Sequence, residues 1–104
     1  MKKILLLCAA GMSTSMVVKK MRESAAQKGI EVQIDAHSVE TITDFLNEYD
    51  LFLLGPQIRF KQPELQKMAA SVGKHVDVID MMDYGMMRGD KILDAALAQL
   101  TQTV

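Results

Sequence analysis

Four short segments of the sequence have the hydrophobic patterns of β-strands, and they fall into two classes. Residues 3–8 and 51–54 form apolar runs, whereas residues 31–36 and 75–79 alternate between apolar and polar positions. Strands that are buried on both faces of a sheet are apolar throughout, and strands at an edge alternate. We therefore predict a four-stranded parallel sheet of order 2-1-3-4, with the first and third strands in the centre.

Helical patterns fill the segments between these strands. A first helix follows the hydroxyl cluster Ser13–Ser15 and ends at Gly29, because a glycine directly after a lysine is typical of a helix C-terminus. A short helix is predicted over residues 41–48, with Ser38 or Thr41 as its N-cap and with Phe45 and Leu46 turned inward.

Two longer helices complete the second half of the chain. One begins near Pro63 and Glu64 and ends before Gly73, and the last starts after Gly89-Asp90. The helix positions expected to face the core are apolar, namely Val17, Met21, Ala25, Leu65, Met68, Ala69, Val72, Ile92, Leu93, Ala96, Leu97 and Leu100. Strands that alternate with helices predict a single α/β domain over residues 1–104, built as a three-layer sandwich.

Composition and charge exclude several functional classes. The chain has 12 basic and 13 acidic residues and a net charge of −1, without the basic surplus of a nucleic-acid binder. No apolar stretch approaches the length of a membrane span. The start Met1-Lys2-Lys3 resembles a signal peptide, but its removal would delete a central strand. We expect a cytoplasmic protein that binds no nucleic acid and is not inserted in a membrane.

The cysteine count limits the chemistry further. A single cysteine, Cys8, excludes an internal disulfide, and no Cys/His cluster has the spacing of a metal site. A reducing compartment agrees with this composition. The sequence therefore predicts neither a metal nor a cofactor.

The predicted strand order places two loops together. Ligands of such sheets bind beyond the carboxyl ends of the strands, where the strand order reverses, which here is between the first and third strands. The loop Cys8–Ser15 and the loop Gly55–Ile58 follow these two strands. The only cysteine of the chain thus falls at the position where a ligand is expected.

The first loop has the composition of a phosphate cradle. Its residues are small or carry hydroxyls, apart from the cysteine and one methionine: Cys8, Ala9, Ala10, Gly11, Met12, Ser13, Thr14 and Ser15. Successive amides that lead into a helix N-terminus form a concave anion site, and hydroxyls add further donors. The same amides would favour the thiolate form of Cys8, which can attack phosphorus. We therefore predict that Cys8 accepts a phosphoryl group.

The cysteine and the hydroxyl residues of this loop each have a simpler structural interpretation when taken alone. A lone cysteine at a strand end is usually a small buried hydrophobe, and serines after a strand usually cap a helix. Other loop motifs do not fit, because this loop has one glycine and no lysine, whereas a P-loop ends in Gly-Lys-Ser/Thr and a dinucleotide site has three spaced glycines. A single cysteine also cannot supply a Cys-x-x-Cys pair. The cysteine, the small residues, Gly11 and the three hydroxyls occur together at the switch point of the sheet, and this combination favours a phosphate-binding loop.

The loop resembles that of the low-molecular-weight protein tyrosine phosphatases, which share the strand order and a nucleophilic cysteine after the first strand. Those enzymes have an arginine near the end of the loop, where this chain has Thr14. A guanidinium would form bidentate hydrogen bonds with the phosphoryl group and stabilise the transfer of this group to water. Its absence favours a carrier over a hydrolase.

The whole chain resembles a more specific family. The Cys8–Ser15 loop, the segment Leu53–Ile58, the segment Val78–Asp80 and Tyr84-Gly85 are similar to the IIB component of the phosphoenolpyruvate-dependent sugar phosphotransferase systems, in the lactose, cellobiose and N,N'-diacetylchitobiose family. The resemblance implies that Cys8 receives a phosphoryl group from a phosphohistidine of a IIA partner. It also implies that Cys8 passes this group to a sugar bound by the membrane transporter IIC, and that the loop amides of Ala9–Ser15 hold the phosphoryl oxygens. We expect a monomer, because the site must be exposed to two partners.

Residues outside the loop carry weaker signals. Gln57 either lines the site or is an exposed loop amide. Asp80 and Tyr84 are expected to order the turn after the fourth strand. For Asp80, a role as a general acid is the alternative. Arg59 and Lys61 either steer a phosphorylated partner or are simply solvated. His37 and His75 are interpreted as structural.

The nine methionines form two groups. Met21 and Met68 occupy core positions of helices, whereas Met12, Met16, Met86 and Met87 are expected near the active end. Flexible thioethers suit a surface that docks two partners, and they suit core packing equally well.

Two alternatives stay open at this point. The first is a cysteine-dependent phosphatase or arsenate reductase on the same fold, which would be detected by turnover of a phosphate ester. The second is a module that binds flavin or a small anion without a covalent step.

Overall fold

The structure is a computed structural model that describes residues 2–9 and 14–102. Its strands are β1 (Lys2–Cys8), β2 (Val32–Ser38), β3 (Leu51–Leu54) and β4 (His75–Val78). Its α-helices are α1 (Thr14–Lys28), α2 (Ile42–Phe45), α3 (Gln62–Ala70), α4 (Met81–Gly85) and α5 (Gly89–Gln102). Short 3₁₀ helices cover Val39–Thr41 and Pro56–Lys61.

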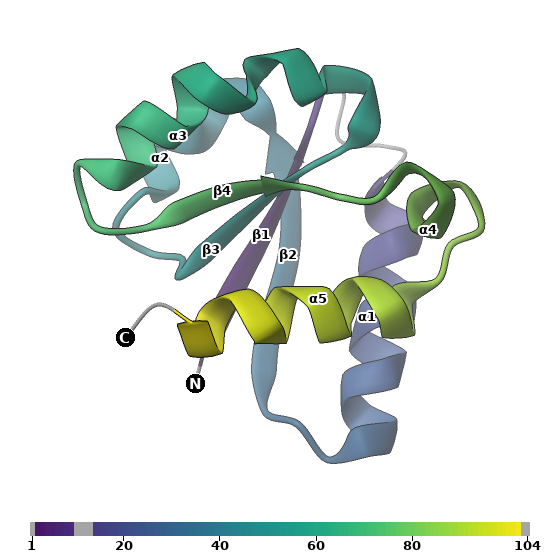
Figure 1. The fold of residues 1–104 in the computed structure, drawn as a ribbon. Helices are drawn as coiled ribbons and strands as arrows, with labels where there is room; N and C mark the ends of the chain where they lie inside the picture. Colours follow the sequence, from purple (N-terminus) through teal and green to yellow (C-terminus); the bar gives the residue numbers. More distant parts are fainter. Residues whose placement is uncertain (1, 10–13, 103–104) are drawn as a thin grey trace.

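The strands form one four-stranded sheet in the order β2-β1-β3-β4, and every neighbouring pair is parallel. This confirms the predicted order and the central place of β1 and β3 (Figure 1). Leu7, one residue before the cysteine, pairs with His37 of β2 and with Leu54 of β3. The carboxyl ends of the three strands therefore meet at one edge of the sheet.

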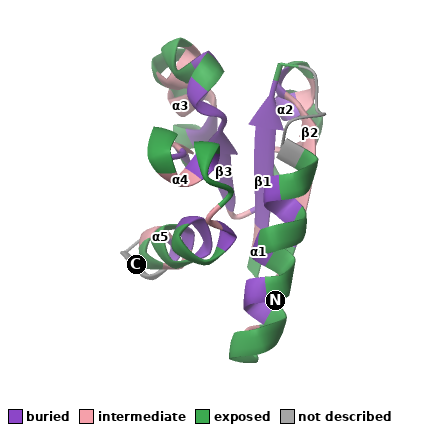
Figure 2. Ribbon diagram, turned by 90° about the vertical axis from the view of Figure 1, so that its right-hand side faces the viewer, coloured by how far each residue is buried: buried purple, intermediate pink, exposed green. Residues whose placement is uncertain are grey.

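Two separate apolar cores lie on the two faces of the sheet, which makes the domain a three-layer sandwich. Ile4 and Leu6 of β1 pack with α1 and α5, whereas Leu5 and Leu7 pack with α2 and α3. Figure 1 shows the two pairs of helices on opposite sides of the strands. The strand β1 is buried from Ile4 to Cys8, and Figure 2 shows it as a buried strand between the helices, as its apolar run predicts.

The longer helices agree closely with the predicted limits. The helix α1 ends at Lys28, and Gly29 follows with a φ of +67°, a conformation that glycine adopts without strain. The helix α3 ends before Gly73, which has a φ of +72°. The helix α5 begins at Gly89 itself. One expected core position is wrong, because Val72 follows the end of α3 and is exposed.

The short helix predicted over residues 41–48 is different in the structure. A 3₁₀ turn precedes α2, and α2 ends at Phe45. Thr41 is the N-cap residue of α2 and Ser38 that of the 3₁₀ turn, as predicted, but neither caps through its side chain. The Thr41 hydroxyl instead donates to the Ser38 carbonyl over 2.7 Å, because a Thr oxygen can bond back to the preceding turn. Phe45 and Leu46 do pack against the core, as predicted.

Candidate functional site

Cys8 is the last residue of β1 and is only 4% exposed. Side chains alternate along a strand, so Cys8 lies on the same face as Ile4 and Leu6, which is the face covered by α1 and α5. Ala9 follows in a bend and is exposed. The chain thus leaves the core within one residue after the sulfur.

The helix α1 begins at Thr14, shortly after this strand end. Its first turn contains no acidic residue, whereas α3 and α5 carry Glu64 and Asp90 there. An anion at the N-terminus of α1 is therefore favoured by the helix dipole and meets no carboxylate of the first turn. Ala10, Gly11, Met12 and Ser13 of the predicted cradle lie outside the described residues. The structure does place Cys8, Ala9 and Ser15 at the two ends of that loop.

Gly55 brings three distant segments together beside the end of β1. Its amide donates to the Leu7 carbonyl over 3.0 Å. A Cβ added at Gly55 would lie 3.0 Å from Gln57 Oε1, 3.8 Å from the Leu7 carbonyl oxygen and 4.0 Å from the Tyr84 hydroxyl. The absence of a side chain at Gly55 therefore leaves room for the side-chain oxygen of Gln57 and the hydroxyl of Tyr84 beside this glycine. Of the possible lining residues Gln57, Asp80 and Tyr84, the structure thus brings Gln57 and Tyr84 close to Gly55.

Gly55 is the residue that the sequence interpretation missed. The loop Gly55–Ile58 was expected at the switch point, but the glycine itself received no role. Its position between a buried strand and Pro56 was the available signal, because a glycine there often marks a close approach of other groups.

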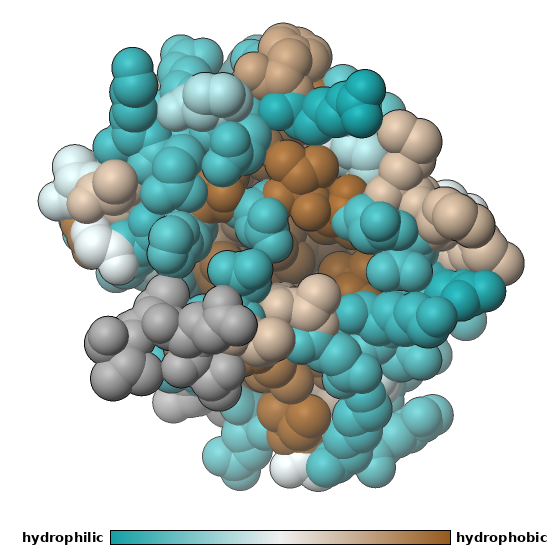
Figure 3. All heavy atoms as spheres, viewed as in Figure 1, coloured by the Kyte–Doolittle hydropathy of each residue, from teal (hydrophilic) through white to brown (hydrophobic). Residues whose placement is uncertain are grey.

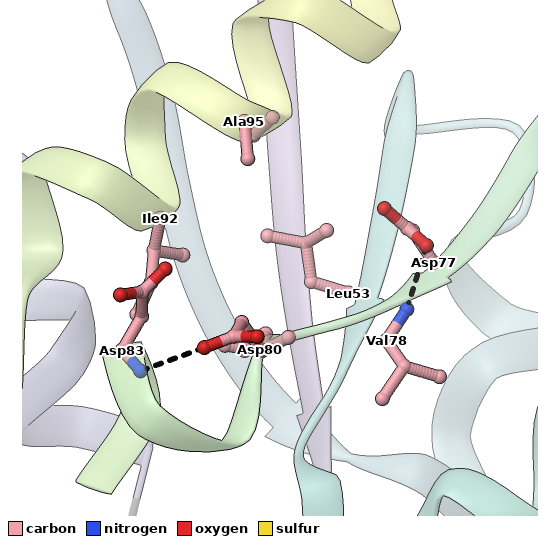
Figure 4. Close-up of a pocket in the computed structure, with 9 residues that line it drawn as sticks. Leu53, Asp77, Val78, Asp80, Asp83, Ile92 and Ala95 are labelled. Carbon is pink, nitrogen blue, oxygen red and sulfur yellow. Dashed lines mark hydrogen bonds between the residues drawn. The ribbon is translucent and has the colours of Figure 1, made fainter.

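Asp80 has a structural task that the structure shows directly. The segment after β4 is not an irregular turn but the short helix α4, and Asp80 is its N-cap. One carboxylate oxygen accepts hydrogen bonds of 3.1 Å from the amides of Met82 and Asp83. Figure 4 shows the carboxylate of Asp80 next to the backbone of Asp83 in a small pocket beside α5. Tyr84 is a buried residue of α4 and packs in the α1–α5 core.

Comparison with known proteins decides the family. Residues 3–95 match the family described as "PTS system, Lactose/Cellobiose specific IIB subunit". The chain belongs to this family of phosphotransferase IIB components. It is thus a sugar-specific IIB component, and such components are phosphotransferases that work with IIA and IIC partners.

Three relatives are nearly equally similar to this IIB chain. The galactose-specific EIIB component of Lactococcus lactis subsp. cremoris (strain MG1363) and the cellobiose-specific EIIB component of Lactococcus lactis subsp. lactis (strain IL1403) are each 49% identical, covering 91% of this chain and 93% of the relative. The oligo-beta-mannoside-specific EIIB component of Bacillus subtilis (strain 168) is 46% identical, covering 94% and 95%. Their names differ in the sugar, so similarity alone does not select one.

Solved structures agree with the fold. A lactose-specific IIB domain from Streptococcus pneumoniae has a TM-score of 0.85 at 24% identity, covering 94% of this chain and 96% of that one. A cellobiose-specific IIB protein from Borrelia burgdorferi has a TM-score of 0.82 at 34% identity, covering 98% and 94%. A YwlE mutant from Bacillus subtilis, with the low-molecular-weight tyrosine phosphatase fold, has a TM-score of 0.59 at 16% identity, covering 97% and 99%. The last likeness concerns the fold alone.

Exposed methionines gather next to the candidate site. Met81, Met82, Met86 and Met87 belong to α4 or follow it directly, and Met16 is exposed on α1. In Figure 3 light brown side chains project at the right-hand edge, where α4 lies in Figure 1. Met21 is buried in the core, as predicted, and Met68 packs partly buried against the other core. Met12 lies outside the described residues.

The remaining candidates are found at the surface or in packing contacts. Arg59 is exposed, as is the neighbouring Phe60. The ring of His37 stacks on Phe45 at 4.4 Å between centroids, and His75 is an exposed residue at the start of β4. Within the described ranges, no cluster of His, Cys, Asp and Glu could hold a metal ion. The helices of those ranges include none that is long and apolar enough to cross a membrane.

Proposed function

We propose that Cys8 is the phosphorylated residue of this IIB component. It accepts a phosphoryl group from a phosphohistidine of a IIA partner and passes it to a sugar of the cellobiose, chitobiose or lactose type on the IIC transporter. The observation that carries the proposal is the position of Cys8. It ends a central strand at the carboxyl edge of the sheet, shortly before the N-terminus of α1, whose first turn has no acidic residue.

Both steps are displacements at phosphorus. In the first, the Cys8 thiolate attacks the phosphorus, an S–P bond forms, the N–P bond breaks and the imidazole keeps the electron pair. In the second, a sugar hydroxyl attacks, an O–P bond forms and the S–P bond breaks, which restores the thiolate. The hydroxyl proton leaves to a base of the acceptor complex or to water.

Backbone amides of residues 9–15 would hold the phosphoryl oxygens in both states. An exposed amide loop stabilises the thiolate and the thiophosphate dianion by the same dipoles, so the site needs little reorganisation between them. Ser13, Thr14 and Ser15 would add hydroxyl donors. The Tyr84 hydroxyl and the Gln57 side-chain oxygen, which lie near Gly55, would line the site on the side of the loop that follows β3.

The neutral character of this loop supports a carrier over a hydrolase. No arginine or lysine occurs between Cys8 and Ser15. The loop therefore has no cationic side chain that would stabilise the charge on the phosphoryl group while water attacks it. The thiophosphate then persists until an acceptor docks.

Intact-mass spectrometry tests the proposal. The chain is incubated with phosphoenolpyruvate, the general phosphotransferase proteins and a IIA protein. A single phosphoryl adduct is expected, and it is absent from Cys8→Ser. A Ser71→Ala variant, changed at an exposed hydroxyl in the connection that leads from α3 to the start of β4, is the matched control and retains the adduct. An adduct that persists in Cys8→Ser would refute the assignment, as would steady turnover of a chromogenic phosphate ester by the unmodified chain.

A further inference from the structure

Four of the nine methionines fall within seven residues, in α4 and directly after it. Met81, Met82, Met86 and Met87 are 60%, 71%, 57% and 42% exposed. We call residues 81–87 the methionine segment. By contrast, Met21 in α1 is fully buried, and Met68 in α3 is partly buried.

We infer that the methionine segment is oxidised before the packed methionines Met21 and Met68, and that its oxidation slows phosphoryl exchange at Cys8. Met16 of α1 is 46% exposed and should react together with the segment. The first half stands on exposure alone. The second half rests on the proposed function of Cys8.

The oxidation step is a transfer of one oxygen atom from a peroxide. The thioether sulfur attacks one peroxide oxygen, an S–O bond forms, the O–O bond breaks, and the second oxygen leaves as water or an alcohol after it takes up a proton. The sulfur loses two electrons and the peroxide gains them. The attack requires that peroxide reach the sulfur, so exposed thioethers react first and Met21 is protected by the core.

The fold should survive this oxidation. The helix α4 is held by Tyr84, which packs in the α1–α5 core, and by the Asp80 cap, whereas Met81 and Met82 project into solvent. A sulfoxide at an exposed methionine therefore removes no core contact. It does replace an apolar group by a strong dipole on the surface next to the site.

The position of α4 explains why exchange at Cys8 would respond. The Tyr84 hydroxyl of α4 lies near Gly55, whose amide bonds to Leu7, one residue before Cys8. A partner protein that brings phosphorus to the barely exposed sulfur must cover this face. Covering a sulfoxide without a hydrogen-bond partner costs free energy that an apolar thioether does not cost.

Peptide mapping tests the first half. The full-length Cys8→Ser chain, in which methionine is the only sulfur residue, is treated with dilute hydrogen peroxide and sampled over time. Sulfoxide is expected in residues 81–87 well before it appears at Met21 or Met68. Oxidation of Met21 or Met68 at an equal rate would overturn the inference.

Phosphorylation kinetics test the second half. Wild type and a variant with Met81→Leu, Met82→Leu, Met86→Leu and Met87→Leu are oxidised, treated with dithiothreitol to restore cysteine, and each compared with its own unoxidised rate. Wild type is expected to lose about tenfold in kcat/KM for the IIA donor, as burial of unpaired polar groups implies, and the leucine variant less than about twofold. Methionine sulfoxide reductases should restore the wild-type rate. Equal losses in both proteins, or no loss in either, would overturn this half.

The two proposals fail in different ways. If the unoxidised chain takes no phosphoryl group on Cys8, the proposed function and the second half fail together. The peptide map still decides where oxidation falls.

Discussion

The hydroxyl of Tyr49 donates a hydrogen bond of 2.8 Å to the carboxylate of Asp35, and this contact ties the segment before β3 to the edge strand β2. Asp35 also accepts from Arg22 over 2.9 Å and from Gln33 over 2.8 Å. The Lys3 ammonium lies 4.9 Å from the centre of the Tyr49 ring. A polar network thus fastens the outer strand of an otherwise apolar sheet.

This contact predicts a dependence of stability on alkaline pH. Burial first, and then the hydrogen bond and charge of Asp35, raise the pKa of Tyr49 from 10.0 to about 12. Because the folded pKa lies above the unfolded one, the contact stabilises the fold fully below pH 10 and is lost between pH 10 and about 12. Tyr49→Phe should cost about 1 kcal/mol near neutral pH.

Urea unfolding of wild type and Tyr49→Phe measures this difference as pH rises. The gap between the two proteins should close towards pH 12. A difference in stability that stays constant with pH would contradict this prediction.

At acid pH the relevant group is Asp35. Burial by itself raises the pKa of Asp35, but the hydrogen bonds from Gln33, Tyr49 and Arg22 outweigh burial and leave the pKa lowered. That part of the stability is present above 3.8 and is lost as pH falls through the lower folded pKa.

The second prediction concerns the outer edge of β4. Gln66 of α3 accepts from the Val76 amide over 2.8 Å, and Gln62 donates to the Val76 carbonyl over 3.0 Å. The two side chains thus bond to the backbone N–H and C=O of Val76, groups at the edge of the sheet with which the strand of another molecule could otherwise pair. Gln66→Leu should destabilise the fold by about 1 kcal/mol and promote self-association. Sedimentation velocity over a concentration series measures the latter, and Gln66→Glu, which keeps the acceptor, is the control that should associate less. A monomeric Gln66→Leu would contradict the edge role.

The third prediction tests the contact between α1 and α5. A Cβ at Gly89 would lie 2.5 Å from the Lys20 carbonyl carbon and 2.6 Å from the Met21 nitrogen, so the two helices touch through backbone. Gly89→Ala should therefore cost about 2 kcal/mol, the usual scale of overpacking. Gly85→Ala is the matched control, because a Cβ there meets nothing within 4 Å. Thermal unfolding should lower the midpoint only for Gly89→Ala, and equal midpoints would refute the contact.

The fourth prediction separates a cap from a general acid at Asp80. Asn accepts the same amide hydrogen bonds but cannot transfer a proton, so Asp80→Asn should retain both stability and the rate of Cys8 phosphorylation. Asp80→Ala should lose about 1 kcal/mol of stability. Loss of the phosphorylation rate in Asp80→Asn, with its stability intact, would assign Asp80 to the chemistry.

The fifth prediction concerns the neutral loop. Thr14→Arg should shorten the lifetime of the phosphorylated chain by about tenfold or more, because a guanidinium stabilises charge on the phosphoryl group during hydrolysis. Thr14→Gln has a similar length and no charge, and its lifetime should stay near that of wild type. The decay of the adduct is followed by mass spectrometry. An unchanged lifetime in Thr14→Arg would count against the carrier explanation.

The sequence predicted the sheet well because its signal is local. The apolar runs of β1 and β3 and the alternation in β2 and β4 each reflect burial of that strand alone, and they separate the central strands from the edge strands. The arrangement that doubly wound α/β sheets share then gives the order. Gly29 likewise marks the end of α1 through its own backbone.

The features that were missed depend on short or distant interactions. The helix α4 has five residues, which is too short to show a period, and only the Asp80 cap signals it. Ser38 and Thr41 were both plausible caps, but the Thr41 hydroxyl has a competing acceptor in the Ser38 carbonyl. The approach of Tyr84 to Gly55 joins residues far apart in sequence, so no local pattern could predict it.

The burial of β1 between two neighbouring strands has a mechanical consequence. Cys8 pairs with Ser38 of β2, and Leu7 before it pairs with both β2 and β3, so displacing the sulfur would require breaking ladder bonds of β1. When a partner protein docks, any conformational change that aligns its phosphoryl group with the sulfur must therefore occur in the partner or in the segments around Cys8, and not in β1.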